Sequence, residues 1–167
     1  MEDLVESILD YVRSDYTDYA IMINGEWGVG KTHFWNNKIR KKIESMQLNG
    51  KRYTTIYMSL YGISNLEEIS KKIFMETTQL MDKNLRRFMN SKGQETIPEY
   101  AKTGLDMANF FGVTQNGDKL DYGEFFSTDD KVLCFDDLER ANVDVIDILG
   151  YINNFVEHDH IKTIIIC

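Results

Sequence analysis

Apolar side chains recur along the first fifty residues with the spacing of helices and of buried strands. A helical spacing joins Leu4, Val5, Ile8, Leu9 and Val12, which predicts a short amphipathic helix. The compact apolar run at 19–24 then predicts a buried strand. A second helix is expected to begin within the glycine-rich segment that follows and to continue to Met46. Asn49-Gly50 predicts a turn after it.

The same succession of strand and helix returns later in the chain. Residues 53–60 are rich in β-branched and aromatic side chains and predict a second strand, followed by a helix that reaches Leu80. Apolar runs at 131–136 and 163–167 predict two more buried strands, with a helix between them. Because the strands are too far apart for hairpins, crossover connections and a mainly parallel sheet are expected.

The predicted fold class is therefore α/β, a three-layer α/β/α sandwich. Within its sheet we expect the strand at 19–24 to lie centrally, next to the final strand, with the strand at 131–136 beyond it. The chain is interpreted as one domain, 1–167, with a variable insertion at 86–130. Since an apolar strand at the end of an α/β chain needs a covering helix, we expect the domain to continue beyond Cys167.

Composition and charge narrow the classes of protein. The chain has 167 residues, of which 43% are hydrophobic and 28% charged, with one proline, as in a globular domain with a continuous core. A net charge of −8 repels phosphate backbones and argues against nucleic acid as the main partner. Basic clusters at 38–42 and 86–92 are interpreted as solvated helix faces.

The cysteines and the N-terminus indicate a cytoplasmic protein. Cys134 and Cys167 lie in apolar, strand-like runs, which is typical of buried thiols in a reducing compartment. Met1-Glu2-Asp3 lacks the basic and apolar pattern of a signal peptide. No apolar run approaches the roughly 20 residues that span a bilayer, so no membrane association is expected.

The strongest chemical signal is the segment from Gly25 to Thr32, which matches the P-loop pattern G-x-x-x-x-G-K-S/T between a strand and a helix. Glycines let backbone N–H groups turn toward phosphate oxygens, and the N-terminus of the following helix attracts negative charge. Lys31 is expected to reach the β- and γ-phosphates and Thr32 to coordinate Mg²⁺. The predicted nucleotide-binding residues are Gly25, Glu26, Trp27, Gly28, Val29, Gly30, Lys31, Thr32 and His33.

A second signal is the acid at the end of the strand 131–136. Asp136 is expected at the edge of the sheet where α/β proteins bind ligands, and there it can hold Mg²⁺. Asp137 is the first candidate to polarise the attacking water, and Glu139 is the second. Arg140 is interpreted as a partner in a structural ion pair, with sensing of the nucleotide as its alternative role.

Three segments together resemble the KAP family of P-loop NTPases, within the STAND-like and AAA-like class. They are the tryptophan-containing loop at 25–32, Met58-Ser59-Leu60-Tyr61-Gly62-Ile63, and Phe135-Asp136-Asp137-Leu138-Glu139-Arg140. The last has Glu139 where the family carries the third aspartate, the one before arginine, in Asp-Asp-Leu-Asp-Arg. The resemblance covers residues 19–167. It implies that Lys31 and Thr32 serve the phosphates and Mg²⁺, Asp136 the metal, and Asp137 the hydrolytic water.

The family resemblance also implies an ATPase that acts as a conformational switch or motor in a larger assembly. ATP and Mg²⁺ are the cofactors it implies, and ATP over GTP is a preference taken from the family. Bacterial relatives often belong to anti-phage systems. Many family members carry membrane helices between the P-loop and the acidic motif, which correspond here to residues 25–32 and 135–140. Here that region offers only Met107–Val113, which is too short to span a membrane. A homo-oligomer or partner protein is expected to bind through the region beyond Cys167, since no arginine finger can be identified.

The sequence is also compatible with other functions. A regulatory module could bind nucleotide and hardly turn it over, and a small-molecule kinase shares the P-loop. A GTPase is disfavoured because Asn37-Lys38 lacks the required aspartate two residues later. His158 and His160 flank an aspartate but are interpreted as part of a solvated turn rather than a metal site. Trp27 is the better candidate for ligand contact, while Trp35 is expected in the core.

Overall fold

The computed structural model describes residues 2–48, 50–80 and 130–167. The chain divides into two compact units, residues 1–66 with 122–167, and residues 67–121. Nearly all of the expected insertion at 86–130, including the basic cluster at 86–92 and Met107–Val113, lies outside the described residues. Helix α4 (Leu66–Leu80) belongs almost entirely to the second unit and carries buried Ile69 and Ile73 at helical spacing.

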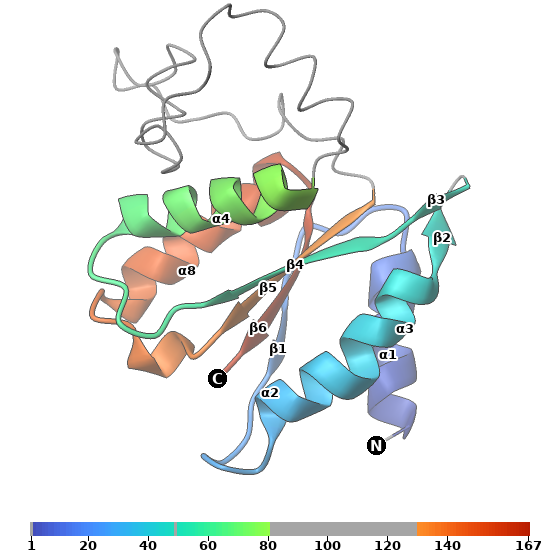
Figure 1. Ribbon diagram of the computed structural model, residues 1–167, viewed down its shortest axis with the longest axis horizontal. Helices are drawn as coiled ribbons and strands as arrows, with labels where there is room; N and C mark the ends of the chain where they lie inside the picture. The colour runs from blue at the N-terminus through green and yellow to red at the C-terminus, as the bar shows by residue number, and fades with distance from the viewer. Residues whose placement is uncertain (1, 49, 81–129) are drawn as a thin grey trace, which may run out of the picture. The chain divides into compact units, whose positions relative to one another are not determined.

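Four of the described strands of the first unit form a parallel sheet in the order β1-β6-β5-β4 (Figure 1). Their bounds are Ile21–Ile23 for β1, Thr54–Ser59 for β4, Lys131–Asp136 for β5 and Lys162–Ile166 for β6. Each of the four strands had been predicted, and the α/β class with a parallel sheet is confirmed.

The position of β1 corrects one expectation. Among the described strands β1 pairs only with β6 and lies at an edge of the sheet, not at its centre. The reason is the direction of the crossovers. From β1 the chain passes over two strand positions to β4, and β5 and β6 then fill the gap, so no described strand forms on the other side of β1. The neighbours β6 and then β5 are as predicted.

Helices cover both faces of the sheet in the first unit (Figure 1). On one face lie α1 (Glu2–Arg13), α2 (Lys31–Phe34), the wider π-helical turn η1 (Trp35–Ile39) and α3 (Arg40–Ser45). On the other lie α8 (Val145–Asn153) and a second π-helical turn, η4 (Asn154–His158). None of the helices in the described residues is long and apolar enough to cross a membrane.

Strand alternation divides the core between the two faces. Val132 and Cys134 of β5 are buried in one cluster with Trp35, on the side of α1 to α3. Phe135 points to the opposite side, where its ring lies 6.5 Å from that of Phe155 in η4. Because side chains alternate along a strand, Asp136 at the end of β5 falls on the same face as Val132 and Cys134, toward α2.

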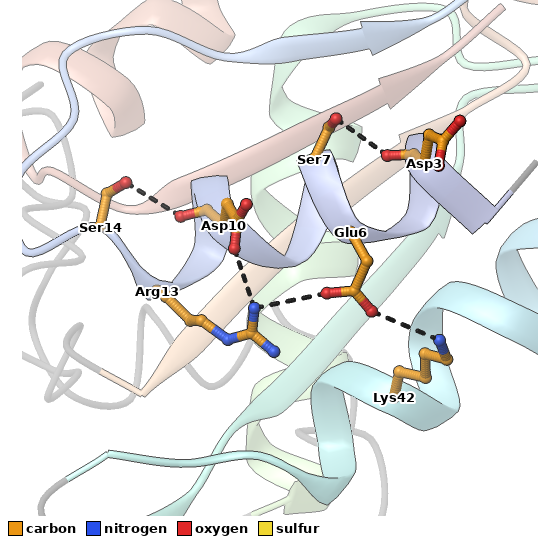
Figure 2. Close-up of polar contacts among 7 residues, drawn as sticks. All are labelled: Asp3, Glu6, Ser7, Asp10, Arg13, Ser14 and Lys42. Carbon is orange, nitrogen blue, oxygen red and sulfur yellow. Dashed lines mark hydrogen bonds and ion pairs between the residues drawn. The ribbon is translucent and has the colours of Figure 1, made fainter.

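Helix α1 is amphipathic as predicted. Its buried stripe contains Val5, Ile8, Leu9 and Val12, and its other side carries exposed charges (Figure 2). There the Glu6 carboxylate lies 3.6 Å from Arg13 and 3.7 Å from Lys42 of α3. Exposed pairs of this kind contribute about 1 kcal/mol or less. The apolar stripe therefore provides most of the attachment of α1.

Two small elements were not predicted. Strands β2 (Gln47–Leu48) and β3 (Lys51–Arg52) form a short antiparallel hairpin, in which Gly50 adopts a φ of 80°. A single turn of 3₁₀-helix, η3 (Leu138–Arg140), follows β5. The hairpin falls on the turn expected at Asn49-Gly50, and η3 brings Arg140 back toward the end of β4.

Candidate functional site

The glycine-rich loop runs from the end of β1 to the start of α2. Gly28 and Gly30 have φ angles of 83° and 90°, a region that side chains with a Cβ rarely adopt. The base of the loop is fixed to the sheet, since Gly25 N donates to Cys167 O at 3.3 Å and Cys167 N donates to Ile23 O at 3.2 Å. The loop thus begins at a fixed position and ends on a helix N-terminus.

Lys31 lies across this loop. Its Nζ atom donates to the carbonyl oxygens of Gly25 at 2.6 Å and Glu26 at 3.1 Å. The ammonium group therefore lies against the loop backbone, at a solvent-exposed position.

Thr32 and Asp136 meet although 104 residues separate them. The Thr32 hydroxyl donates to Asp136 Oδ2 at 2.7 Å. Asp136 is only 2% exposed, and a buried carboxylate is tolerated only when donors surround it. Two further donors do so, Tyr57 Oη to Oδ2 at 2.8 Å and Asp137 N to Oδ1 at 2.8 Å.

The Tyr57 hydroxyl stays protonated and therefore donates a hydrogen bond in this cluster across the neutral pH range. Burial raises the pKa of Tyr57 above its usual value of 10.0, and the neighbouring Asp136 carboxylate raises it further. The phenol therefore stays protonated throughout the neutral range. Its proton is directed to Asp136.

Asp137 is held in an uncommon backbone conformation. Its φ is 59°, a left-handed value that aspartate tolerates better than most residues. Its Oδ2 accepts from the Ser59 hydroxyl at 2.7 Å, and its Oδ1 lies 3.6 Å from Arg140. The Arg140 guanidinium also lies 4.2 Å from the centre of the Tyr61 ring. The predicted ion pair of Arg140 is therefore present, with Asp137 as its partner.

The segment after β4 continues beside the segment after β5 beyond the end of the sheet. Leu60 N donates to Asp136 O at 2.8 Å, and Gly62 N donates to Arg140 O at 3.1 Å. Asn142 N in turn donates to Ile63 O at 2.8 Å. These backbone bonds hold the two segments in register past the paired acids.

The remaining predicted residues lie around this group. Glu139 is exposed on η3, and His33 is exposed at the start of α2. Burial raises the pKa of the Cys167 thiol, Glu139 raises it further and Lys31 lowers it, so both charges act near the end of β6. Trp27 is 83% exposed on the loop, whereas Trp35 is fully buried, as expected.

The oxygen donors present fit Mg²⁺. This ion prefers one or two carboxylates together with phosphate and water oxygens. The Thr32 hydroxyl donates its hydrogen bond to Asp136, which leaves the lone pairs of its oxygen available to a cation. Within the described ranges no group of three or more histidine, cysteine, aspartate or glutamate side chains could hold a metal ion, His158 and His160 included.

Two residues of this cluster were missed in the sequence. Tyr57 and Ser59 had been assigned only to the second strand and to the family segment, with no role toward the acids. The signal that could have found them is their spacing of two, which puts both hydroxyls on one face of β4. The strand that pairs with β4 was not predictable in the same way.

The model of one protein family matches the chain, that of the KAP family P-loop domain, over residues 2–167. The chain matches no curated protein and no solved structure.

Proposed function

Because the chain belongs to the KAP family of P-loop domains, we propose that it binds ATP with Mg²⁺ and hydrolyses it. One observation carries this proposal. The hydroxyl of Thr32, at the end of the glycine-rich loop, bonds to the buried carboxylate of Asp136, at the end of β5. A hydroxyl and a carboxylate beside a P-loop lysine are the protein groups that a nucleotide with Mg²⁺ requires.

Each group has a role in this proposal. The backbone N–H groups of residues 25–30 and the N-terminus of α2 bind phosphate oxygens, and Lys31 neutralises the β- and γ-phosphates. Thr32 and Asp136 hold Mg²⁺, which when bound withdraws charge from the phosphate oxygens. Asp137 orients and polarises the attacking water, and Glu139 is the second candidate for that role. Trp27 is exposed beside the phosphate-binding backbone and contacts the ligand.

The energy of hydrolysis then drives a conformational change, as a switch or motor within a larger assembly. The support is the geometry of the acids. Asp136 and Asp137 are hydrogen-bonded to β4 and to the segment that follows it, which offers a change at the phosphates a route away from the site. A role in anti-phage defence rests on the family resemblance alone.

Calorimetric titration with ATP and Mg²⁺ tests the proposal. Lys31→Ala removes a charge that contacts the loop and not the core, so the variant should fold and lose most of its nucleotide affinity. Lys41→Ala is the matched control, because Lys41 is exposed on α3 and makes a long contact of 3.4 Å to Asn37 of η1. Unchanged affinity in a folded Lys31→Ala variant would overturn the assignment. A parallel titration with GTP shows whether the site binds adenine or guanine nucleotides more tightly.

A further inference from the structure

Strand β4 presents two hydroxyl groups to the two acids at the end of β5. Tyr57 and Ser59 are two residues apart and therefore lie on the same face of the strand, the face toward α2. In the parallel register Ser59 is opposite Asp136, and Tyr57 is opposite Cys134. The Tyr57 hydroxyl reaches forward to Asp136, and the Ser59 hydroxyl reaches forward to Asp137.

The contact of Tyr57 constrains Asp136. Thr32 and Tyr57 donate to the same oxygen, Oδ2, while the backbone of Asp137 donates to Oδ1. The Tyr57 ring is half-buried and packs against the core cluster beneath α1 and α3, so its hydroxyl is held by packing. Both carboxylate oxygens are thus fixed, and Oδ2 is held beside the Thr32 hydroxyl.

The contact of Ser59 constrains Asp137 in the same manner. Its hydroxyl donates to Oδ2 at 2.7 Å and accepts from Tyr61 N at 3.2 Å, so it is itself fixed from the backbone. Arg140 approaches the other carboxylate oxygen at 3.6 Å. A carboxylate has about four lone-pair sites, so these contacts orient the group and leave it able to accept from a water molecule.

We propose that β4 is the positioning strand of this site, with Tyr57 aligning Asp136 for the metal ion and Ser59 aligning Asp137 for the attacking water. This inference rests on the proposed function and assigns roles to residues outside the loop and the acids. When a group that hydrogen-bonds to a metal-ligating side chain is removed, metal affinity or activity typically falls 10–100-fold.

The Tyr57 role is tested by the Mg²⁺ dependence of nucleotide affinity. A fluorescent ATP analogue is titrated at several Mg²⁺ concentrations, and once in EDTA. In Tyr57→Phe the Mg²⁺ concentration for half-maximal tight binding should rise by roughly 10–100-fold, with affinity in EDTA unchanged. Tyr53→Phe is the matched control. It removes another buried tyrosine hydroxyl, which donates to Val12 O at 3.1 Å, and should leave the Mg²⁺ dependence as in the parent.

The Ser59 role is tested by separating kcat from nucleotide affinity. In Ser59→Ala we expect kcat to fall by roughly 10-fold or more at saturating ATP and Mg²⁺, with nucleotide affinity retained. Ser59→Thr keeps the hydroxyl and suits a strand, so it should restore the rate. A kcat equal to that of the parent, or raised above it, in Ser59→Ala would contradict the positioning role.

A measurement without nucleotide separates this inference from the proposed function. In a double-mutant cycle, Tyr57→Phe and Asp136→Asn should be non-additive in urea unfolding, as should Ser59→Ala and Asp137→Asn. Additive effects in both cycles overturn the positioning strand. If the parent binds ATP with Mg²⁺ and Tyr57→Phe keeps its Mg²⁺ dependence, the Tyr57 role fails alone. If the parent binds no ATP, the proposed function fails, and the cycles still decide the contacts.

Discussion

Asp136 and Asp137 are neighbours in the chain but occupy different environments. Asp136 is 2% exposed and accepts three hydrogen bonds, so both of its carboxylate oxygens have donors inside the fold. Asp137 is partly exposed and takes one hydroxyl and one guanidinium. A buried, fixed carboxylate suits a metal ligand, whereas a partly exposed one can receive a water molecule. This difference supports the proposed division of roles between the two acids.

Asp137→Asn should retain ATP binding and slow hydrolysis by about 10²–10⁴-fold, the usual contribution of a positioned base. Asparagine tolerates the left-handed backbone at this position, where φ is 59°, so the loop should keep its shape. Steady-state phosphate release beside ligand titration measures both effects. Glu139→Gln is the matched comparison. Full activity in Asp137→Asn, with loss of activity in Glu139→Gln, would assign the base to Glu139 instead.

Among the elements, α8 depends on a single side-chain cap. Asp144 precedes the helix, and its carboxylate accepts from Ile146 N at 2.7 Å. The first turn of a helix has N–H groups without partners inside the helix, so this bond stabilises its start. Helix α8 covers the face of the sheet opposite to the site, where Ile148 and Ile152 are buried. Its stability therefore contributes to holding β5 and the acids in place.

Removal of that cap should lower the free energy of unfolding. Asp144→Ala is expected to cost about 1 kcal/mol, within a usual range of about 0.5–2 kcal/mol, while Asp144→Asn should cost much less because asparagine caps equally well. Urea unfolding of the two variants and the parent measures the difference. Equal losses in both variants would show that the charge of Asp144, and not its capping bond, is what stabilises α8.

For the whole molecule, the buried cysteine of β5 links stability to pH. Burial raises the pKa of the Cys134 thiol well above its usual value of 9.0, and the charge of Asp136 adds to this effect. In the folded protein the thiol stays protonated, whereas in the unfolded chain it ionises above about pH 9. Its contribution to stability is therefore complete below that pH and is lost as the pH rises toward the folded-state pKa.

Cys134→Ala should make the protein less sensitive to alkali. Between about pH 9 and 10.5 the free energy of unfolding of the parent should fall more steeply, by up to about 1.4 kcal/mol per pH unit. The pKa of Tyr11 is raised by burial too, but both proteins share this contribution. Urea unfolding across the pH series gives the slope of the free energy of unfolding against pH for each protein. The slopes are compared and not the absolute free energies, because the smaller alanine side chain alters those as well. Parallel curves above pH 9 would contradict the burial of a protonated thiol.

The sequence by itself determined the local features of this protein. Apolar spacing predicted α1 and the strands β1, β4, β5 and β6, because a helix and a buried strand each impose their own period on the side chains. The spacing of the glycines and the lysine located the loop at 25–32, because few structures other than a P-loop require these residues at this spacing. Asp136 was placed at a strand end by the same local pattern.

The tertiary structure decided which of these features meet. Strand order is set by the crossovers, and the periodic spacing of apolar residues carries no information about them. The prediction from the sequence therefore placed β1 at the centre, whereas the described sheet has it at an edge. The pairing of β4 with β5 brings Tyr57 and Ser59 to the acids, and only the packed sheet shows that their hydroxyls point there. Contacts between residues far apart in the chain depend on the packing of the whole domain, because every strand must bury its faces at once.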